Sequence, residues 1–227
     1  MIEDLSQREL KKILENIRKT SLYPKKVQII AVTKTLNYSA IKAAYKNNIF
    51  NIGESKIQEI EKKIQKKQKL KKLKIHLIGH LQTNKAKKAV LLCDYIQSVD
   101  SIKIAEKINK EASLINKIQK IYLQINIGED DKKYGFSTNQ IFSKCDQITK
   151  MSNLQVVGIM TILPQAVSEQ KTKKLFLKTK QIKEEIQKTI CTTCKELSMG
   201  MSGDYKTALK MGATNIRIGT RLYGKRK

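Results

Sequence analysis

Lys34 is the first residue of this chain whose type and position together indicate chemistry. It follows a run of aliphatic and β-branched residues that predicts a buried strand, and it ends the stretch Ala31-Val32-Thr33-Lys34. Alternation along the strand puts Lys34 on the same face as Ile30 and Val32. An amine held out of water beside another cation has a lowered pKa and can act as a nucleophile. Since 46 basic residues less five arginines leaves 41 lysines, only its position distinguishes Lys34.

A second group of candidate residues lies near the end of the sequence. Ser202 precedes a predicted helix, and Gly219-Thr220 follows a predicted strand, so backbone amides and hydroxyl groups there could hold a phosphate. Arg217 alternates with two isoleucines and therefore faces the opposite side of its strand. A buried arginine keeps its proton and needs a partner, which is either a structural carboxylate or a ligand. Together with the Lys34 amine, these groups fit a phosphorylated aldehyde such as pyridoxal 5′-phosphate (PLP).

Two other spacings with chemical meaning are weaker. Cys191 and Cys194 have the spacing of a zinc or redox pair, but no further pair of zinc ligands accompanies them, and they fall at a helix end. His76 and His80 flank a predicted strand, where about 13 Å would separate them at ~3.3 Å per residue. We therefore expect no metal site from either pair.

The elements that must position these residues alternate regularly along the chain. Eight predicted strands are separated by amphipathic helical stretches, and such alternation in a chain of this length indicates a (β/α)₈ TIM-type barrel. An open doubly wound sheet is the alternative, but no glycine-rich dinucleotide turn follows the first strand. The predicted strands are Val27–Thr33, Ile49–Gly53, Lys74–Gly79, Tyr95–Val99, Ile121–Ile127, Leu154–Thr161, Lys195–Met199 and Asn215–Gly219. The predicted helices are Leu5–Arg18, Tyr38–Lys46, Ser55–Lys69, Thr83–Leu91, Ser101–Asn116, Thr138–Thr149, Ser168–Thr189 and Gly203–Lys210.

We expect one domain, residues 1–227, in which an extra N-terminal helix precedes the barrel. Its lumen should be partly polar, because Tyr122, Gln124 and Asn126 share one face of the fifth strand. Asp100 and Ser202 are predicted helix caps, and Gly212 is a predicted helix stop. In a barrel of this type, Lys34 and the last two loops all lie at the rim formed by the carboxyl ends of the strands.

The charge of +26 has two interpretations. It could form a surface for nucleic acid or acidic lipid, or it could reflect solvated helix faces that use lysine. The densest run, residues 62–74, has no aromatic residue for base stacking, so we expect neither nucleic acid nor membrane as a partner. No segment reaches the roughly 18 apolar residues of a membrane helix, and the charged first dozen residues do not resemble an export signal. These features predict a cytoplasmic protein with reduced cysteines.

Several segments of the chain resemble the pyridoxal phosphate homeostasis protein family (YggS/PROSC), which is related to the N-terminal barrel of alanine racemase. They occur in family order along the whole chain, and the last of them is the most specific. The matching segments are Ala31-Val32-Thr33-Lys34-Thr35, Ile52-Gly53-Glu54, Ile57-Gln58-Glu59, His76–Lys85, Gly158-Ile159-Met160-Thr161-Ile162 and Leu197–Gly224.

The resemblance implies a (β/α)₈ barrel that holds PLP as a Schiff base on Lys34. It implies phosphate contacts from Ser202, Gly219 and Thr220, and it places Arg217 against the pyridine nitrogen with Ser198 nearby. The implied role is intracellular PLP homeostasis, in which the protein buffers PLP and delivers it to PLP-dependent apo-enzymes without catalytic turnover.

This sequence departs from the family pattern at two positions near Lys34. Ser55 stands where the family usually has asparagine, and Leu36 stands where it often has a lysine, which puts a ring-side contact and a secondary PLP site in doubt. The alternative function is that of a PLP-dependent, racemase-like enzyme. We favour the carrier because an arginine cannot protonate the pyridine nitrogen, and because 227 − 220 leaves only seven residues after Thr220 for the second β-domain of such enzymes. Lacking that domain, the chain is expected to be a monomer.

Overall fold

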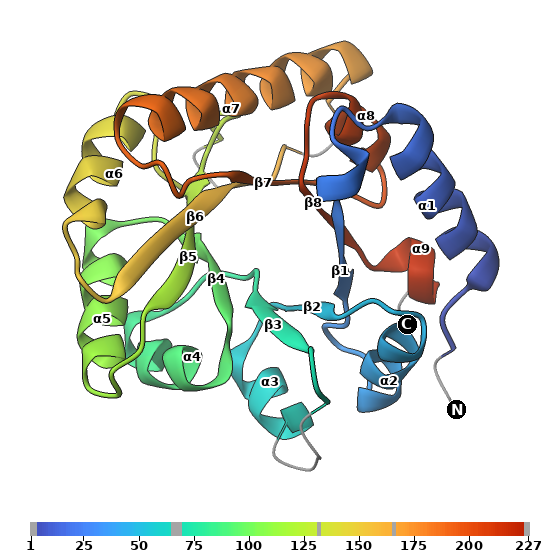
Figure 1. The fold of residues 1–227 in the computed structure, drawn as a ribbon, viewed down its shortest axis with the longest axis horizontal. Coiled ribbons are helices and arrows are strands. Elements are labelled where there is room, and N and C mark those ends of the chain that lie inside the picture. Colours follow the sequence, from blue (N-terminus) through green and yellow to red (C-terminus); the bar gives the residue numbers. More distant parts are fainter. Residues whose placement is uncertain (1–3, 65–69, 131–132, 165–166, 225–227) are drawn as a thin grey trace.

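The computed structural model describes residues 4–64, 70–130, 133–164 and 167–224. Within these residues, eight parallel strands form a closed barrel in chain order, so the predicted (β/α)₈ fold is confirmed (Figure 1). Each strand follows the preceding one around the ring, and β8 pairs with β1 to close it. The strands are β1 Gln28–Val32, β2 Asn51–Glu54, β3 Lys74–Leu77, β4 Tyr95–Val99, β5 Gln119–Ile125, β6 Leu154–Thr161, β7 Glu196–Met201 and β8 Asn215–Ile218.

Helices cover the outside of the ring. The α-helices are α1 Gln7–Thr20, α2 Tyr38–Lys46, α3 Ile57–Ile64, α4 Ala86–Leu92, α5 Ile102–Ser113, α6 Ile141–Thr149, α7 Glu169–Thr189, α8 Tyr205–Lys210 and α9 Thr220–Tyr223, and short 3₁₀ turns are η1 Pro24–Lys26 and η2 Thr83–Lys85. The extra N-terminal helix α1 lies beside α8 and α9 (Figure 1). It is tied there by the hydrogen bond from the Ser6 N–H to the Leu222 carbonyl (2.9 Å) and by the ion pair between Glu9 and Arg221 (3.0 Å).

The two faces of each strand have different environments. Aliphatic residues such as Ile52, Ile121 and Ile216 are fully buried in one continuous core between the strands and the helices. Burial of this apolar surface is the main driving force for closing the barrel. The other face of the strands lines the lumen, where Tyr122 packs with Met160 in a separate small cluster. The sequence-based assignment of Tyr122 to the lumen is therefore confirmed.

Most element boundaries differ from the predicted ones by a few residues. Ser101, and not Asp100, caps α5, because its hydroxyl oxygen accepts the Ile104 N–H (3.3 Å). The predicted helix Ser55–Lys69 is observed as α3, and its last five residues, 65–69, lie outside the described residues. Gly212 ends α8 with φ of +90°, as predicted.

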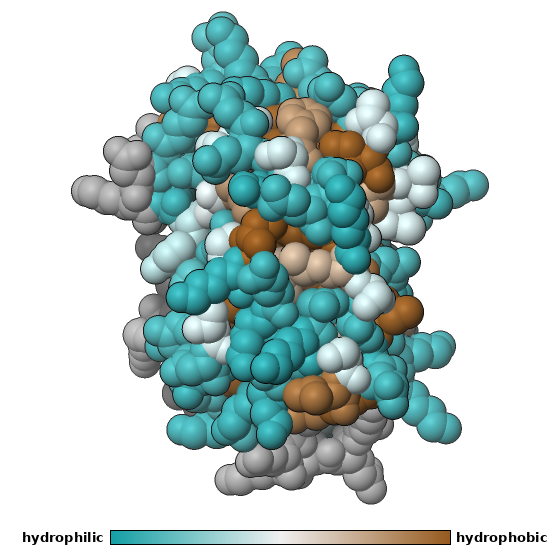
Figure 2. Space-filling model, turned by 90° about the vertical axis from the view of Figure 1, so that its left-hand side faces the viewer, coloured by the Kyte–Doolittle hydropathy of each residue, from teal (hydrophilic) through white to brown (hydrophobic). Residues whose placement is uncertain are grey.

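The side of the barrel covered by α5 and α6 is mostly hydrophilic, and its hydrophobic residues lie in separate small patches (Figure 2). Several exposed lysines pair with carboxylates four residues away, as Lys150 does with Asp146 (2.6 Å) and Lys19 with Glu15 (2.6 Å). Exposed pairs of this kind contribute little to stability. None of the described helices is long and apolar enough to cross a membrane.

Candidate functional site

Lys34 lies two residues beyond the end of β1, at the rim formed by the carboxyl ends of the strands. Ile30 and Val32 face the lumen, since a Cβ on Gly53 of the neighbouring strand would approach their side chains at 2.9 and 3.6 Å. The Lys34 side chain is half-buried, and none of the described residues forms a hydrogen bond or ion pair with it. Its amine is therefore available to a ligand.

The loop after β8 reaches the same rim as Lys34. β1 and β8 pair in parallel with Ile30 opposite Arg217. Gly219 and Thr220 therefore follow β8 at the level where Lys34 follows β1. Gly219 is buried, whereas Thr220 is exposed at the first position of α9.

The loop after β7 meets the loop after β8. The Ser202 carbonyl accepts a hydrogen bond from Arg221 Nε (2.7 Å), and its hydroxyl accepts the Arg221 N–H (3.4 Å). The prediction that Ser202 caps the following helix is wrong. Asp204 is the residue before α8, and its carboxylate accepts the Met201 N–H (2.6 Å), because the chain makes a tight turn before the helix begins. The structure thus brings Ser202, Gly219 and Thr220 to one side of the rim.

Arg217 lies inside the lumen and is only 3% exposed. Its guanidinium donates hydrogen bonds to the Ser198 hydroxyl (2.7 Å) and the Thr161 carbonyl (2.7 Å), which are both neutral. No carboxylate among the described residues forms an ion pair with Arg217. Of the two partners expected from the sequence, the structural carboxylate is therefore not observed. Burial lowers the pKa of Arg217 to about 10, and the more distant Asp204 opposes this shift. The side chain still carries a positive charge at neutral pH.

A chain of hydrogen bonds runs from Arg217 across the lumen. The Ser198 hydroxyl accepts from Arg217 and donates to Gln97 Oε1 (2.7 Å). Gln97 Nε2 then lies 2.9 Å from His76 Nδ1, and His76 Nε2 lies 3.0 Å from Asn51 Oδ1. Four strands of the barrel are linked to β8 in this way. We call these five residues the lumen chain.

The direction of the lumen chain follows from its chemistry. Arginine can only donate, so the Ser198 hydroxyl must give its own proton to Gln97, whose amide nitrogen then donates to His76. His76 must therefore accept at Nδ1 and carry its proton at Nε2. Burial lowers the pKa of His76 to about 3, which keeps the ring neutral. Every link of the chain thus has one donor and one acceptor.

The comparisons with known proteins agree with this geometry. Residues 8–227 match the alanine racemase N-terminal domain family. A pyridoxal phosphate homeostasis protein from Synechocystis is 39% identical over 203 residues, covering 89% of this chain and 93% of the relative. The human protein of that name is 30% identical over 223 residues, covering 88% and 76%. PipY of Synechococcus elongatus, solved with PLP bound, has a TM-score of 0.85 at 33% identity, covering 96% of this chain and 99% of PipY.

The chain belongs to the pyridoxal phosphate homeostasis protein family. An alanine racemase from Clostridium difficile shares the barrel fold with this family member, with a TM-score of 0.77 at 19% identity. The match covers 98% of this chain but 58% of the racemase.

Sequence reasoning missed two parts of the site in this family member. The lumen chain includes Gln97 and His76, which alternate with buried aliphatic residues, so the reasoning applied to the fifth strand would have found them. Lys63, which is buried behind the Lys34 loop, could not be separated from the other lysines by its type. Its only local signal is the carboxylate of Glu59, four residues earlier.

The two histidines and the cysteine pair have separate surroundings. His76 belongs to the lumen chain, whereas His80 Nδ1 lies 2.9 Å from Asp100 Oδ2 and its ring stacks on Tyr134. Cys191 and Cys194 are buried and free. No cluster of metal-binding side chains occurs in the part of the chain that the structure describes.

Proposed function

We propose that this protein binds PLP as a Schiff base on Lys34 and that it buffers and delivers PLP inside the cell. The observation that carries the proposal is a positively charged Arg217 that is buried in the lumen with only neutral partners, on the strand that pairs with the one leading to the half-buried and available Lys34. A buried guanidinium is costly unless its N–H donors find acceptors, and a ligand can supply a further acceptor beside Ser198 and Thr161. The names of the relatives and the PLP-bound PipY structure support PLP as that ligand.

The donor set fits PLP at three points. Lys34 offers an amine for the aldehyde. Ser202 and Thr220 offer hydroxyl groups, and Gly219 offers backbone at close range, for the phosphate. Arg217, oriented by Ser198, offers a donor for the pyridine nitrogen.

PLP supplies an electrophilic aldehyde and a ring that accepts electrons when its nitrogen is protonated. Arg217 can hydrogen-bond to that nitrogen, but with a pKa of about 10 it does not transfer a proton to it at neutral pH. The lumen chain holds Arg217 in this donor role, since the Ser198 proton is already directed to Gln97. The site therefore favours holding PLP over stabilising a carbanion, and the relatives' names describe homeostasis, not a reaction. We propose a cytoplasmic, monomeric, single-domain carrier that passes PLP to PLP-dependent apo-enzymes.

Borohydride reduction of the PLP-loaded protein tests the linkage. We expect the added mass on the peptide containing Lys34, and none on that peptide in Lys34→Ala. Lys46→Ala, which removes an exposed lysine of the adjacent α2, is the matched control and should label as the wild type does. Absence of label on Lys34 would refute the Schiff base. Incubation with single L-amino acids and chiral analysis tests the carrier role, and repeated turnovers would refute it.

A further inference from the structure

The residue before Lys34 is held from the adjacent strand and helix. The Thr33 hydroxyl donates to Glu54 Oε1 (2.6 Å), at the end of β2. The Thr33 carbonyl accepts a hydrogen bond from Lys63 Nζ (2.7 Å), on α3. The same Lys63 ammonium pairs with Glu54 at 2.6 Å.

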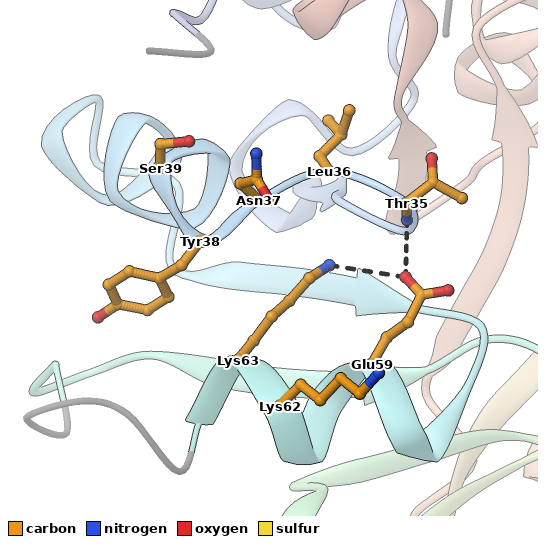
Figure 3. Close-up of a pocket in the computed structure, with 8 residues that line it drawn as sticks. All are labelled: Thr35, Leu36, Asn37, Tyr38, Ser39, Glu59, Lys62 and Lys63. Carbon is orange, nitrogen blue, oxygen red and sulfur yellow. Dashed lines mark hydrogen bonds and ion pairs between the residues drawn. The ribbon is translucent and has the colours of Figure 1, made fainter. Parts of the chain in front are cut away.

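The residue after Lys34 is held from the same helix. The Thr35 N–H donates to Glu59 Oε2 (2.6 Å), and Glu59 also lies 3.7 Å from Lys63 Nζ (Figure 3). Thr35 has φ of +64°, in the left-handed region. A β-branched residue rarely adopts this conformation and keeps it only where its surroundings impose it.

The contacts of Thr33 with Glu54 and Lys63 are shielded from water, whereas the contact of Thr35 with Glu59 is exposed. The side chains of Glu54 and Lys63 are 1% and 10% exposed, and that of Glu59 is 23% exposed. Burial raises the pKa of Glu54, and the Lys63 ammonium opposes that rise. Removing either member of the buried pair of Glu54 and Lys63 leaves the other charge uncompensated, so these two side chains depend on each other.

Packing alone does not fix the loop on this side. A groove of about 530 Å³ separates the loop and the start of α2 from α3. It is lined by Leu36, Tyr38, Glu59, Lys62 and Lys63 among others (Figure 3). Across this open groove, the loop is joined to α3 by the polar contacts of Glu59 and Lys63, in addition to the backbone hydrogen bond from the Thr33 N–H to the Gly53 carbonyl (3.1 Å).

We propose that Glu54, Glu59 and Lys63 form a clamp, here called the α3 clamp, that positions Lys34 by fixing the residues on both sides of it. The clamp residues do not touch the Lys34 amine. They are positioning residues, and they act by holding Thr33 and the left-handed Thr35. This inference rests on the proposed function in one respect, namely that Lys34 is the residue that binds PLP.

Two variants and a matched control test the clamp. Lys63→Met removes the contact to Thr33, and Glu59→Met removes the acceptor of the Thr35 N–H while leaving the buried pair of Glu54 and Lys63 in place. Lys62→Met is the control, since Lys62 is the exposed neighbour that lines the same groove. Lys63→Arg keeps the charge and should restore part of the wild-type behaviour.

Two measurements are made on each variant. Hydrogen exchange of the peptide spanning residues 33–37, without PLP, reports how firmly the loop is held. The rate of borohydride trapping of PLP on Lys34 reports the position of the amine. We expect about tenfold faster exchange and about tenfold slower trapping in Lys63→Met and Glu59→Met, as the loss of one charge-assisted hydrogen bond implies. Lys62→Met should match the wild type in both.

The outcomes separate the clamp from the proposed function. Wild-type exchange or wild-type trapping in Glu59→Met would overturn the clamp, and this variant decides the matter if Lys63→Met does not fold. A wild-type protein that takes no label on Lys34 would instead overturn the proposed function. Faster hydrogen exchange in both variants would then still support the claim that the clamp holds the loop, because hydrogen exchange is measured without PLP.

Discussion

Replacement of Gln97 by methionine probes the lumen chain at its centre. Gln97 is fully buried and uses both ends of its amide, since it accepts from Ser198 (2.7 Å) and lies 2.9 Å from His76 Nδ1. Methionine has a similar volume and can make neither hydrogen bond. Two buried polar groups then lose their partners, at a cost of about 1–3 kcal/mol each. The Ser198 hydroxyl keeps its contact with Arg217, which limits its share of the cost. We therefore expect the free energy of unfolding to fall by about 3 kcal/mol, in the lower part of the combined range for the two groups.

Urea unfolding of the protein without PLP measures this loss. Gln124→Met is the matched control, since Gln124 is a lumen glutamine whose amide, among the described residues, donates only to the carbonyl of the exposed Tyr134. Water can replace that contact, so the control should lose less than about 1 kcal/mol. If Gln97→Met lost no more free energy of unfolding than Gln124→Met, the hydrogen bonds of the lumen chain would not contribute to stability as their geometry indicates.

The remaining predictions concern protonation, reactivity and close packing. The pKa of His76 is about 3 in the folded state, below its ordinary value of 6.5. Between pH 3 and 6.5 the unfolded state therefore binds more protons than the folded state. The free energy of unfolding consequently falls as the pH is lowered from 6.5 to 3. His76→Gln should reduce this loss by about 1 kcal/mol per pH unit in acid-unfolding curves. Burial raises the pKa of Cys93 and Cys145 to about 12. Both thiols should therefore resist iodoacetamide in the native protein and react with it in urea. Rapid alkylation of the native protein would contradict their burial. Gly79→Ala should lower the melting temperature, since its Cβ would lie 2.3 Å from the Ser55 carbonyl, whereas Gly203→Ala, with open space around it, should not.

Several parts of the fold follow from local pattern. The alternation of β-branched runs with amphipathic stretches predicted the order and the closure of the barrel, because each strand must bury one face under a helix. Caps were less predictable. Asp100 was the predicted cap, but Ser101 caps α5, and the Asp100 carboxylate contacts His80 in another loop instead.

The sequence by itself determined the (β/α)₈ architecture, the placement of Arg217 on the lumen side of β8 and the family of the chain, because periodicity and motif spacing are local properties. Only the tertiary structure decided which partners those residues have. Arg217 is surrounded by Ser198 and a carbonyl and not by a carboxylate, and one lysine among many, Lys63, is buried behind the loop of Lys34. Such contacts join strands and helices far apart in the chain, and they depend on the registers at which the closed barrel brings those elements together.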